Sequence, residues 1–154
     1  MLRLESEPQP MRALGIDFGS RRIGVALSAG TLATPFEVVE RSGDRQRDHS
    51  KILALAAEAD AEVLVVGLPL SMDGSVGPAA KGILAEVKEL AKRTSLPVET
   101  IDERLTTVTA DRQLQEQGLN AQARRKVVDK VAASIILQSW LDRRADDPSQ
   151  GTST

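Results

Sequence analysis

The sequence predicts an α/β protein with one mixed five-stranded sheet, three antiparallel strands followed by two parallel strands, flanked by helices. Three segments of strand character follow one another early in the chain, which is typical of an antiparallel meander. Beyond them, apolar segments of strand length alternate with segments of helical spacing, as in βαβ units. A chain of 154 residues with 41% hydrophobic content can build one core. We therefore expect a single domain over residues 11–144, with a disordered extension at 1–10 and a disordered tail at 145–154.

The first strand is predicted at residues 13–18, whose continuous apolar character indicates a central strand buried on both faces. This strand contains one carboxylate, Asp17, and an unpaired ionised carboxylate in an apolar interior costs several kcal/mol. Asp17 is therefore expected at the strand end, facing a cation or hydrogen-bond donors. The alternative is that Asp17 caps its own turn. Gly19 and Gly24 bracket residues 20–22 and predict a hairpin turn that a ligand can approach closely.

Two further strands are predicted at residues 23–28 and 31–40, and Pro35 places the second of them at a sheet edge or at a bulge. Residues 41–48 contain three arginines and a glycine, which predicts a charged loop that is either solvated or in contact with phosphate. Apolar residues at helical spacing predict a helix over residues 51–59.

A fourth strand at residues 62–67 is β-branched and apolar, so we expect it to be central and parallel to the first strand. The following loop contains an Asp-Gly turn signal at residues 73–74. Loops at the carboxyl ends of parallel strands are where ligands bind in open α/β sheets. A helix at residues 78–93 and a fifth strand at residues 97–101 complete a βαβ crossover.

Two adjacent acids, Asp102 and Glu103, follow the fifth strand. Because side chains alternate in direction along a strand, the two cannot face the same way. One of them is a candidate ligand, and the other is a surface or capping group.

Two helices are predicted in the remainder, a short one at residues 108–117 and a long one at residues 121–144. Asp129 lies at the margin of the long helix's apolar stripe, and is either paired with Arg125, four residues earlier, or turned toward the sheet edge. The predicted buried stripe consists of Val128, Val131, Ala132, Ile135, Ile136, Ser139 and Trp140.

The composition excludes several kinds of site. Without cysteine there is no disulfide, thiolate catalysis or sulfur-ligated zinc. The single histidine, His49, lies in a polar segment and is expected to be solvated. The net charge of −2 gives no general attraction to nucleic acid, so nucleic-acid contact requires a local basic patch. Catalysis would have to use carboxylates, with a metal ion as the natural helper.

The chain contains several distinctive motifs, namely residues 15–26, 65–70, 72–74 and 102–107, and Asp129. These motifs resemble those of the YqgF/RuvX family over residues 11–144, and the element order resembles the ribonuclease-H-like fold. This resemblance implies a nuclease that matures the 5′ end of the 16S ribosomal RNA precursor. A second activity that it implies is Holliday junction resolution in DNA recombination and repair.

Carried over from this resemblance, the catalytic and metal-ligating residues become Asp17, Glu103 and Asp129, with Asp102 as a possible auxiliary residue. The implied substrate-binding residues are glycines, prolines, arginines and polar residues of the same motifs. They are Gly19, Arg21, Arg22, Gly67, Pro69, Asp73, Gly74, Arg104, Thr106 and Arg125.

The chemistry of phosphodiester hydrolysis is compatible with these residues. Negative charge develops on the entering and leaving oxygens, and two divalent ions about 4 Å apart stabilise both. Mg²⁺ and Mn²⁺ prefer oxygen ligands, so three carboxylates from separate elements are sufficient without histidine or cysteine. The expected cofactor is therefore a divalent metal, Mg²⁺ or Mn²⁺.

Other interpretations stay open. The sequence from Asp17 to Gly24 also resembles the first phosphate motif of actin-like and sugar-kinase ATPases, but those proteins close two such domains around a nucleotide. A catalytically silent nucleic-acid-binding module of the same fold is a further alternative. Junction resolution needs a symmetric dimer, for which the sequence offers no spare apolar helix.

The expected partner is accordingly an RNA precursor, in preference to branched DNA, and the expected state is a monomer or weak homodimer. Neither a signal peptide nor an apolar run of membrane-spanning length is visible. The lack of cysteine suits a reducing compartment. We therefore expect a cytoplasmic protein without a membrane partner.

Overall fold

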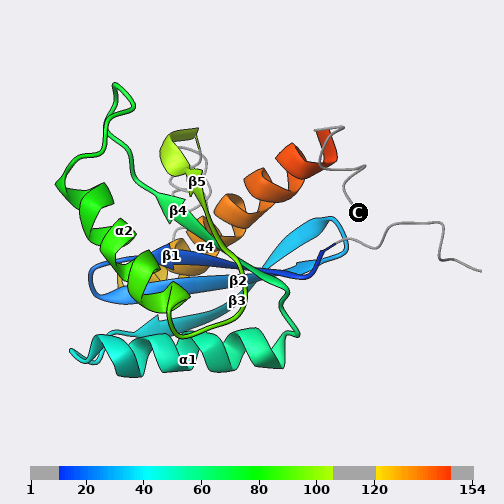
Figure 1. Cartoon of the computed structure of the whole chain (residues 1–154), viewed down its shortest axis with the longest axis horizontal. Coiled ribbons are helices and arrows are strands. Elements are labelled where there is room, and N and C mark those ends of the chain that lie inside the picture. Colours follow the sequence, from blue (N-terminus) through cyan, green and yellow to red (C-terminus); the bar gives the residue numbers. More distant parts are fainter. Residues whose placement is uncertain (1–10, 106–120, 147–154) are drawn as a thin grey trace, which may run out of the picture.

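A five-stranded sheet with the strand order β3-β2-β1-β4-β5 organises the chain in the computed structural model, which describes residues 11–105 and 121–146 (Figure 1). β2 pairs antiparallel with both β1 and β3, whereas β4 pairs parallel with both β1 and β5. The predicted mixed sheet is therefore confirmed. The strands span Ala13–Phe18 (β1), Arg22–Ala29 (β2), Leu32–Glu40 (β3), Val63–Leu68 (β4) and Val98–Asp102 (β5).

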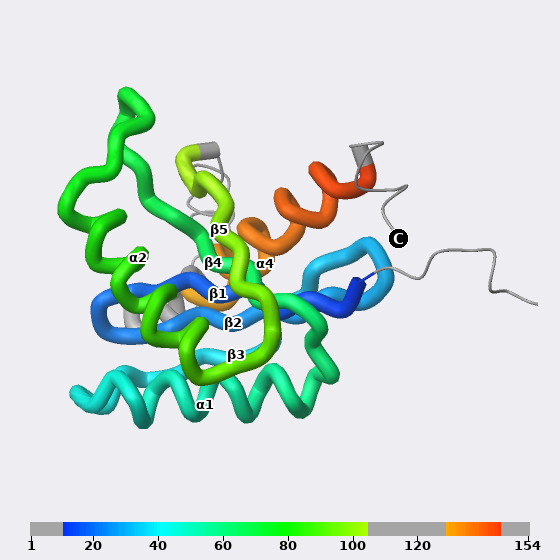
Figure 2. The backbone as a smooth tube through the Cα atoms, in the orientation of Figure 1, coloured from blue at the N-terminus to red at the C-terminus, as the bar shows by residue number. Residues whose placement is uncertain are grey.

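Helices cover both faces of this sheet. α1 (Arg45–Glu58) and α2 (Pro78–Ala91) pack on one face, and α4 (Ala121–Asp146) crosses the other. Figure 2 shows α1 and the orange α4 separated by the strands. A 3-10 helix, η2 (Glu103–Leu105), follows β5 directly. Within the two described ranges, no helix combines the length and apolar character that a membrane span requires.

The two faces of β1 contribute to two different cores. Leu14 and Ile16 are fully buried in the core beneath α1 and α2, whereas Ala13 belongs to the core beneath α4. Because side chains alternate along a strand, Asp17 lies on the same face as Ala13 and points toward α4. The central, doubly covered position predicted for this strand is confirmed, and it places the carboxylate under the long helix.

Pro35 lies on the edge strand β3, next to an irregularity in the pairing. Val25 pairs with Glu37, but Ala26 pairs with Pro35, so the register shifts by a residue between them. An edge strand with a bulge tolerates the missing N–H of proline. Both positions predicted for this residue, edge and bulge, are therefore found together.

The first helix begins earlier than predicted. Its N-terminal cap is Asp44, whose carboxylate accepts hydrogen bonds from the backbone N–H groups of Gln46 and Arg47 at 3.1 and 3.3 Å. The cap satisfies N–H groups that would otherwise lack a partner, so the helix starts at Arg45. The prediction of a loop through residue 48 was wrong for its second half.

The prediction that His49 is solvated was also wrong, because the longer helix carries this residue into the interior. His49 lies three residues before the fully buried Ile52, on the same helical face, and is 1% exposed. Glu86, on the inward face of α2, is buried as well and hydrogen bonds to it. Both residues fall at helical spacing from a buried apolar residue, Ile52 for His49 and Leu90 for Glu86, and this spacing is the signal that could have predicted their burial.

The apolar stripe of α4 is rotated by about one residue from the prediction. Val131, Ala132, Ile135 and Ser139 are only partly buried. Ile136 and Trp140 are buried as predicted, and the other buried residues are Ala133, Leu137 and Leu141. This rotation brings the small side chain of Ala133 against the sheet; Val128 lies among the side chains outside the description.

Some predictions concern residues outside the described ranges. These are the helix at residues 108–117, the extension at residues 1–10 and the tail from residue 147. Residues 145 and 146, predicted to start the tail, complete α4.

Candidate active site

Asp17 lies near the carboxyl end of β1, partly buried beneath α4. Burial raises the pKa of its carboxyl group to about 7, and the negative charges of Glu103 and Asp129 contribute to the increase. The other two acids predicted to form the catalytic centre therefore both lie close enough to Asp17 to raise its pKa. Such mutual repulsion favours the neutral acid until a cation arrives.

Close packing of α4 on the sheet brings Asp129 to this position. A Cβ atom added to Gly15 would lie 2.8 Å from the Leu137 Cβ, and one added to Gly24 would overlap the backbone carbonyl of Asp129. Gly24 is also the β2 partner of Asp17. The strand pair that carries Asp17 therefore touches the turn of α4 that carries Asp129.

Glu103 reaches the same face from the other side of β1. Ile16 pairs with Val66 in the parallel β1–β4 ladder, so the next residues along, Asp17 and Gly67, are neighbours. A Cβ atom on Gly67 would lie 2.6 Å from the Glu103 Oε2. The missing side chain thus makes room for the Glu103 carboxylate, and burial raises its pKa above the ordinary value.

Asp102 and Glu103 face different ways, as strand alternation requires. The Arg104 Nη2 lies 2.6 Å from the Asp102 Oδ2, and hydrogen bonds from Arg104 lower the pKa of Asp102. Glu103, by contrast, contributes to the raised pKa of Asp17. The structure therefore brings Glu103 toward Asp17 and commits Asp102 to Arg104.

Asp129 turns toward the sheet edge, the second of the two predicted orientations. The Arg22 Nε donates to its Oδ2 at 2.6 Å. Burial raises the pKa of Asp129 and the hydrogen bond from Arg22 opposes that effect, leaving the pKa above its ordinary value. The alternative partner, Arg125, has a side chain outside the description.

Comparison with known proteins matches residues 11–143 to the family model described as "RuvX: Holliday junction resolvase". The chain belongs to the RuvX family. A relative from Mycobacterium sp. (strain KMS) is 46% identical over 143 residues, covering 91% of this chain and 85% of its own length. One from Anaeromyxobacter sp. (strain Fw109-5) is 48% identical over 136 residues, covering 87% and 98%. Both carry the name "Putative pre-16S rRNA nuclease".

The solved structure of "T. thermophilus RuvC in complex with Holliday junction substrate" shares the fold. It superposes with a TM-score of 0.54 at 18% identity, covering 88% of this chain and 96% of the other. The resemblance to the YqgF/RuvX family and the ribonuclease-H-like fold are therefore both confirmed for this RuvX-family chain.

The acidic residues of this RuvX-family chain fit a hard divalent cation by their chemistry. They offer carboxylate oxygens from three separate elements, and a cation would relieve the repulsion that, together with burial, raises the pKa of Asp17. Among the described residues, no group of three or more acidic, histidine or cysteine side chains already encloses a metal position. Asp17 and Glu103 would hold the cation, and Asp129 would join them on leaving Arg22.

The predicted substrate-binding residues form two groups in the described structure, and two further predicted residues lie outside the description. Gly19, Arg21 and Arg22 form the turn beside Asp17, where a Cβ on Gly19 would overlap the Arg22 carbonyl. Arg21 is exposed, whereas the Arg22 side chain is occupied by Asp129. Thr106 lies outside the described residues, as does the side chain of Arg125.

The loop after β4 forms the second group. The Asp73 carboxylate accepts hydrogen bonds from the Ser75 hydroxyl and N–H at 2.6 and 2.9 Å, and these lower its pKa. Arg104 ties the loop to β5, because its Nη1 donates to the Met72 carbonyl at 3.1 Å while its Nε binds Asp102. Arg104 thus orders the loop that also contains Gly74, and Pro69 lies partly buried where this loop leaves the sheet.

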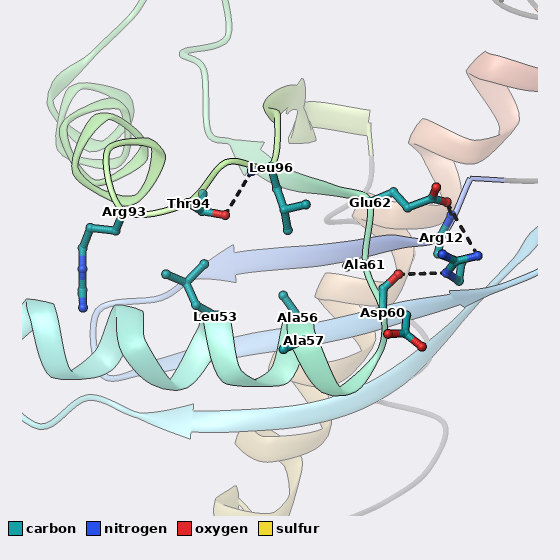
Figure 3. Close-up of a pocket in the computed structure, with 10 residues that line it drawn as sticks. All are labelled: Arg12, Leu53, Ala56, Ala57, Asp60, Ala61, Glu62, Arg93, Thr94 and Leu96. Atoms are coloured by element: carbon teal, nitrogen blue, oxygen red, sulfur yellow. Dashed lines mark hydrogen bonds and ion pairs between the residues drawn. The ribbon is translucent and has the colours of Figure 1, made fainter.

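A pocket of about 500 Å³ lies at the opposite end of the sheet (Figure 3). It is bounded by the end of α1 and the approaches to β4 and β5, with Leu53 and Leu96 in its wall. The Arg12 Nε donates to the Asp60 carbonyl at 2.8 Å at one side of it. This pocket adjoins the amino ends of the parallel strands, whereas Asp17 and Glu103 lie at the carboxyl ends.

Proposed function

We propose that this chain is a metal-dependent nuclease that hydrolyses phosphodiester bonds, using Asp17, Glu103 and Asp129 as its catalytic acids and Mg²⁺ or Mn²⁺ as its cofactor. The observation that carries the proposal is the gathering of Glu103 and Asp129 around the partly buried Asp17, whose pKa rises to about 7 through burial first and the charges of these two acids second. A fold seldom retains such repulsion unless a site requires it.

The substrate we propose is the 5′ end of the 16S ribosomal RNA precursor, and the support for it is the name shared by the Mycobacterium and Anaeromyxobacter relatives. Exposed Arg21 lies beside Asp17 and can meet a phosphate. With a net charge of −2, such local contacts are the available source of affinity. The lack of cysteine is consistent with a cytoplasmic location.

In this mechanism the protein supplies the carboxylate ligands and controls whether they are protonated. A bound divalent cation would polarise the phosphate and lower the pKa of the attacking water. Asp17 must lose its proton to act as a ligand, because its pKa lies near neutrality in the metal-free protein. Arg22 releases Asp129 and becomes available to a phosphate oxygen of the substrate.

Holliday junction resolution is the second candidate function, favoured by the description of the family. Two symmetric cuts need a stable two-fold dimer. Large apolar side chains exposed among the described residues are Leu32 on β3, with Met72 and Val76 on the loop after β4. They form no broad apolar face, so we propose a monomer or weak homodimer and rank RNA processing first.

The deciding experiment presents purified protein with a 16S precursor RNA and a four-way DNA junction, each with Mg²⁺, Mn²⁺ or EDTA. We expect metal-dependent cleavage of the RNA at its 5′ end and little paired nicking of the junction. Symmetric junction nicks together with a tight dimer in sedimentation would reverse the ranking. Binding of either substrate without cleavage under any metal condition would instead indicate the catalytically silent module.

A further inference from the structure

A second group of buried charged residues lies between α1 and α2, on the sheet face opposite α4. At its centre is Glu86, which is 4% exposed. The Arg41 Nη2 lies 2.7 Å from one of its carboxylate oxygens, and the His49 Nε2 lies 2.8 Å from the other. Burial alone would raise the pKa of Glu86, but the hydrogen bonds from Arg41 and His49 outweigh burial and lower it. Glu86 is therefore an ionised anchor for both side chains.

Arg41 connects this anchor to the turn that follows Asp17. Its Nε donates to the Gly19 carbonyl at 2.9 Å, and its backbone N–H donates to the Arg21 carbonyl at 2.9 Å. The guanidinium also lies over the Phe18 ring, 5.6 Å from the ring centroid. A single side chain thus contacts both residues that come directly after Asp17.

Neighbouring residues fix the position of this arginine. The His49 ring packs against the Phe18 ring with centroids 5.8 Å apart. Asp48 accepts a hydrogen bond from the Ser42 hydroxyl at 2.7 Å, which fixes the chain next to Arg41. The Gly19 N–H bonds to the Asp17 carbonyl at 3.0 Å, so the turn held by Arg41 includes the backbone of Asp17 itself.

Stability alone does not account for charged residues at this place. Apolar side chains of similar volume would fill the same space, and replacing buried ion pairs in this way is often neutral or stabilising. No apolar side chain, however, can donate a hydrogen bond to the Gly19 carbonyl. The two donor directions of the guanidinium serve Glu86 and Gly19 at once, which a lysine ammonium on a flexible stem does not reproduce.

We propose that Arg41, anchored by Glu86 and His49, is a positioning residue that fixes the turn at Phe18 and Gly19 and thereby directs the Asp17 carboxylate toward the site beneath α4. This inference rests on the proposed nuclease function, because it assigns Arg41 a role in the geometry of that site. Arg41 touches neither the reacting phosphate nor the other acids, and acts through the backbone.

The test compares Arg41→Lys and Glu86→Gln with Leu90→Ala, a matched control. Leu90 is fully buried on α2, one turn after Glu86, so its truncation destabilises the same helix without touching the turn. Two quantities are measured for each variant: the split between kcat and KM on the RNA substrate with Mn²⁺, and the hydrogen-exchange rate of the Gly19 amide in metal-free protein.

Arg41→Lys and Glu86→Gln should lower kcat about tenfold or more while KM changes less than about twofold, because a displaced carboxylate weakens catalysis more than binding. The Gly19 amide should exchange about tenfold faster in both variants, since the turn loosens. Leu90→Ala should keep both quantities within about twofold of the wild type, even at an equal or larger loss of thermal stability.

If Arg41→Lys and Glu86→Gln behave like Leu90→Ala in both measurements, the positioning role is wrong and the cluster is only structural. A wild-type protein that cleaves, together with an inactive Asp17→Asn variant, would in that case leave the nuclease function standing. A wild-type protein without cleavage removes the nuclease function and with it the catalytic purpose proposed for Arg41. Unchanged Gly19 exchange overturns the fixing of the turn whether or not the protein cleaves.

Discussion

Two groups of buried charged residues, one on each face of the same sheet, differ in how their charge is balanced. Beneath α4, Asp17, Glu103 and Asp129 gather with Arg22 bound to one of them, and the pKa of Asp17 rises to about 7. Between α1 and α2, Glu86 is matched by Arg41 and His49, with the Arg45 Nε 3.9 Å from the same carboxylate, and the pKa of Glu86 falls below its ordinary value. Basic side chains therefore neutralise the carboxylate of Glu86 in the cluster between α1 and α2, whereas among the described residues no basic partner offsets the raised pKa of Asp17 at the proposed catalytic site.

The two groups are joined by a few bonds of β1. Phe18 points into the core beside His49, while its neighbour Asp17 faces the opposite side. Because side chains alternate along a strand, the Glu86 cluster, whose charges are paired, lies directly behind the group of acids around Asp17. Substitutions on the two sides should therefore have opposite effects on stability.

Substitution of Asp17, whose pKa is raised to about 7, should have the largest effect on cleavage. Asp17→Asn should lower cleavage roughly 10³-fold or more, as expected for the loss of a central catalytic group. The raised pKa means that the wild-type acid supports folding fully below about pH 4, and that this support is lost as pH rises through about 7. Metal-free Asp17→Asn should therefore be more stable than the wild type at pH 8, by roughly 2 to 4 kcal/mol.

Urea unfolding in EDTA between pH 4 and pH 8 measures this difference directly. The stability gap between variant and wild type should open as the pH increases. Parallel pH profiles for the two proteins, or full activity in the variant, would contradict the role given to Asp17.

Substitution in the Glu86 cluster should lower stability, the opposite of the effect expected for Asp17→Asn. Glu86→Gln leaves Arg41 without its buried counter-charge and removes the carboxylate that contacts the His49 ring, so the free energy of unfolding should fall by about 3 kcal/mol at neutral pH. Because the pKa of Glu86 is lowered in the fold, its contribution in the wild type is present above the ordinary glutamate pKa and is lost as the pH falls below it.

Glu89→Gln is the control for this variant. Glu89 lies on the same helix and pairs with Arg45 at 2.6 Å, but both side chains are nearly half exposed. The Arg45 Nε also lies 3.9 Å from the Glu86 carboxylate, which stays in place in this variant. Its loss should change stability by less than about 1 kcal/mol in urea unfolding. Equal effects of the two substitutions would show that burial does not distinguish the pairs.

The contact that brings Asp129 to the acidic group can be tested at Gly24. A Cβ there overlaps the Asp129 backbone carbonyl, which cannot rotate away, so Gly24→Ala should displace α4 and lower stability by about 2 kcal/mol. Cleavage should fall with it. Gly82→Ala on α2 is the matched control: nothing lies within 4 Å of the added atom, and alanine in a helix is favoured by about 0.5 to 1 kcal/mol. A stable, active Gly24→Ala protein would refute the close approach.

Arg22 should show the smallest and most selective effect. Arg22→Gln removes a positive charge beside Asp129, so metal-free protein should bind Mn²⁺ about threefold more tightly in calorimetry. The same change removes a proposed phosphate contact, so RNA affinity should fall and its logarithmic salt dependence should flatten by about one. Opposite signs for metal and RNA identify an arginine shared between Asp129 and substrate. Losses of both would mean that Arg22 only holds the fold.

The sequence was most informative where the physics is local. The apolar run containing Asp17 and the Asp73–Gly74 turn follow from neighbouring residues, and the structure has both as predicted. The fifth strand runs one residue further than predicted, so Asp102 ends β5 and only Glu103 follows it. The sequence predicts that Asp102 and Glu103 face different ways, but not which of the two faces Asp17. The choice depended on the space above Gly67, which belongs to another strand.

What could not be predicted depends on partners far along the chain. Arg22 and Asp129 are 107 residues apart, and Glu86 lies 37 residues from His49. A histidine in a polar segment looks solvated until a buried carboxylate from another helix meets it. The start of α1 was missed for a smaller reason, since the capping carboxylate of Asp44 was not weighed against the charge of the following residues.

The order in which the acids occur along the chain also has a consequence during synthesis. Asp17 belongs to β1 and Asp129 to α4, so a growing chain that has emerged through residue 120 contains all the strands that the structure describes but not the third acid. The sheet surface at Gly15 and Gly24, which α4 covers in the folded protein, stays in contact with water until α4 packs on it. The N-terminal part of a chain leaves the ribosome first during synthesis. The proposed nuclease would therefore be inert until the segment that forms α4 has emerged and packed on the sheet with Asp129.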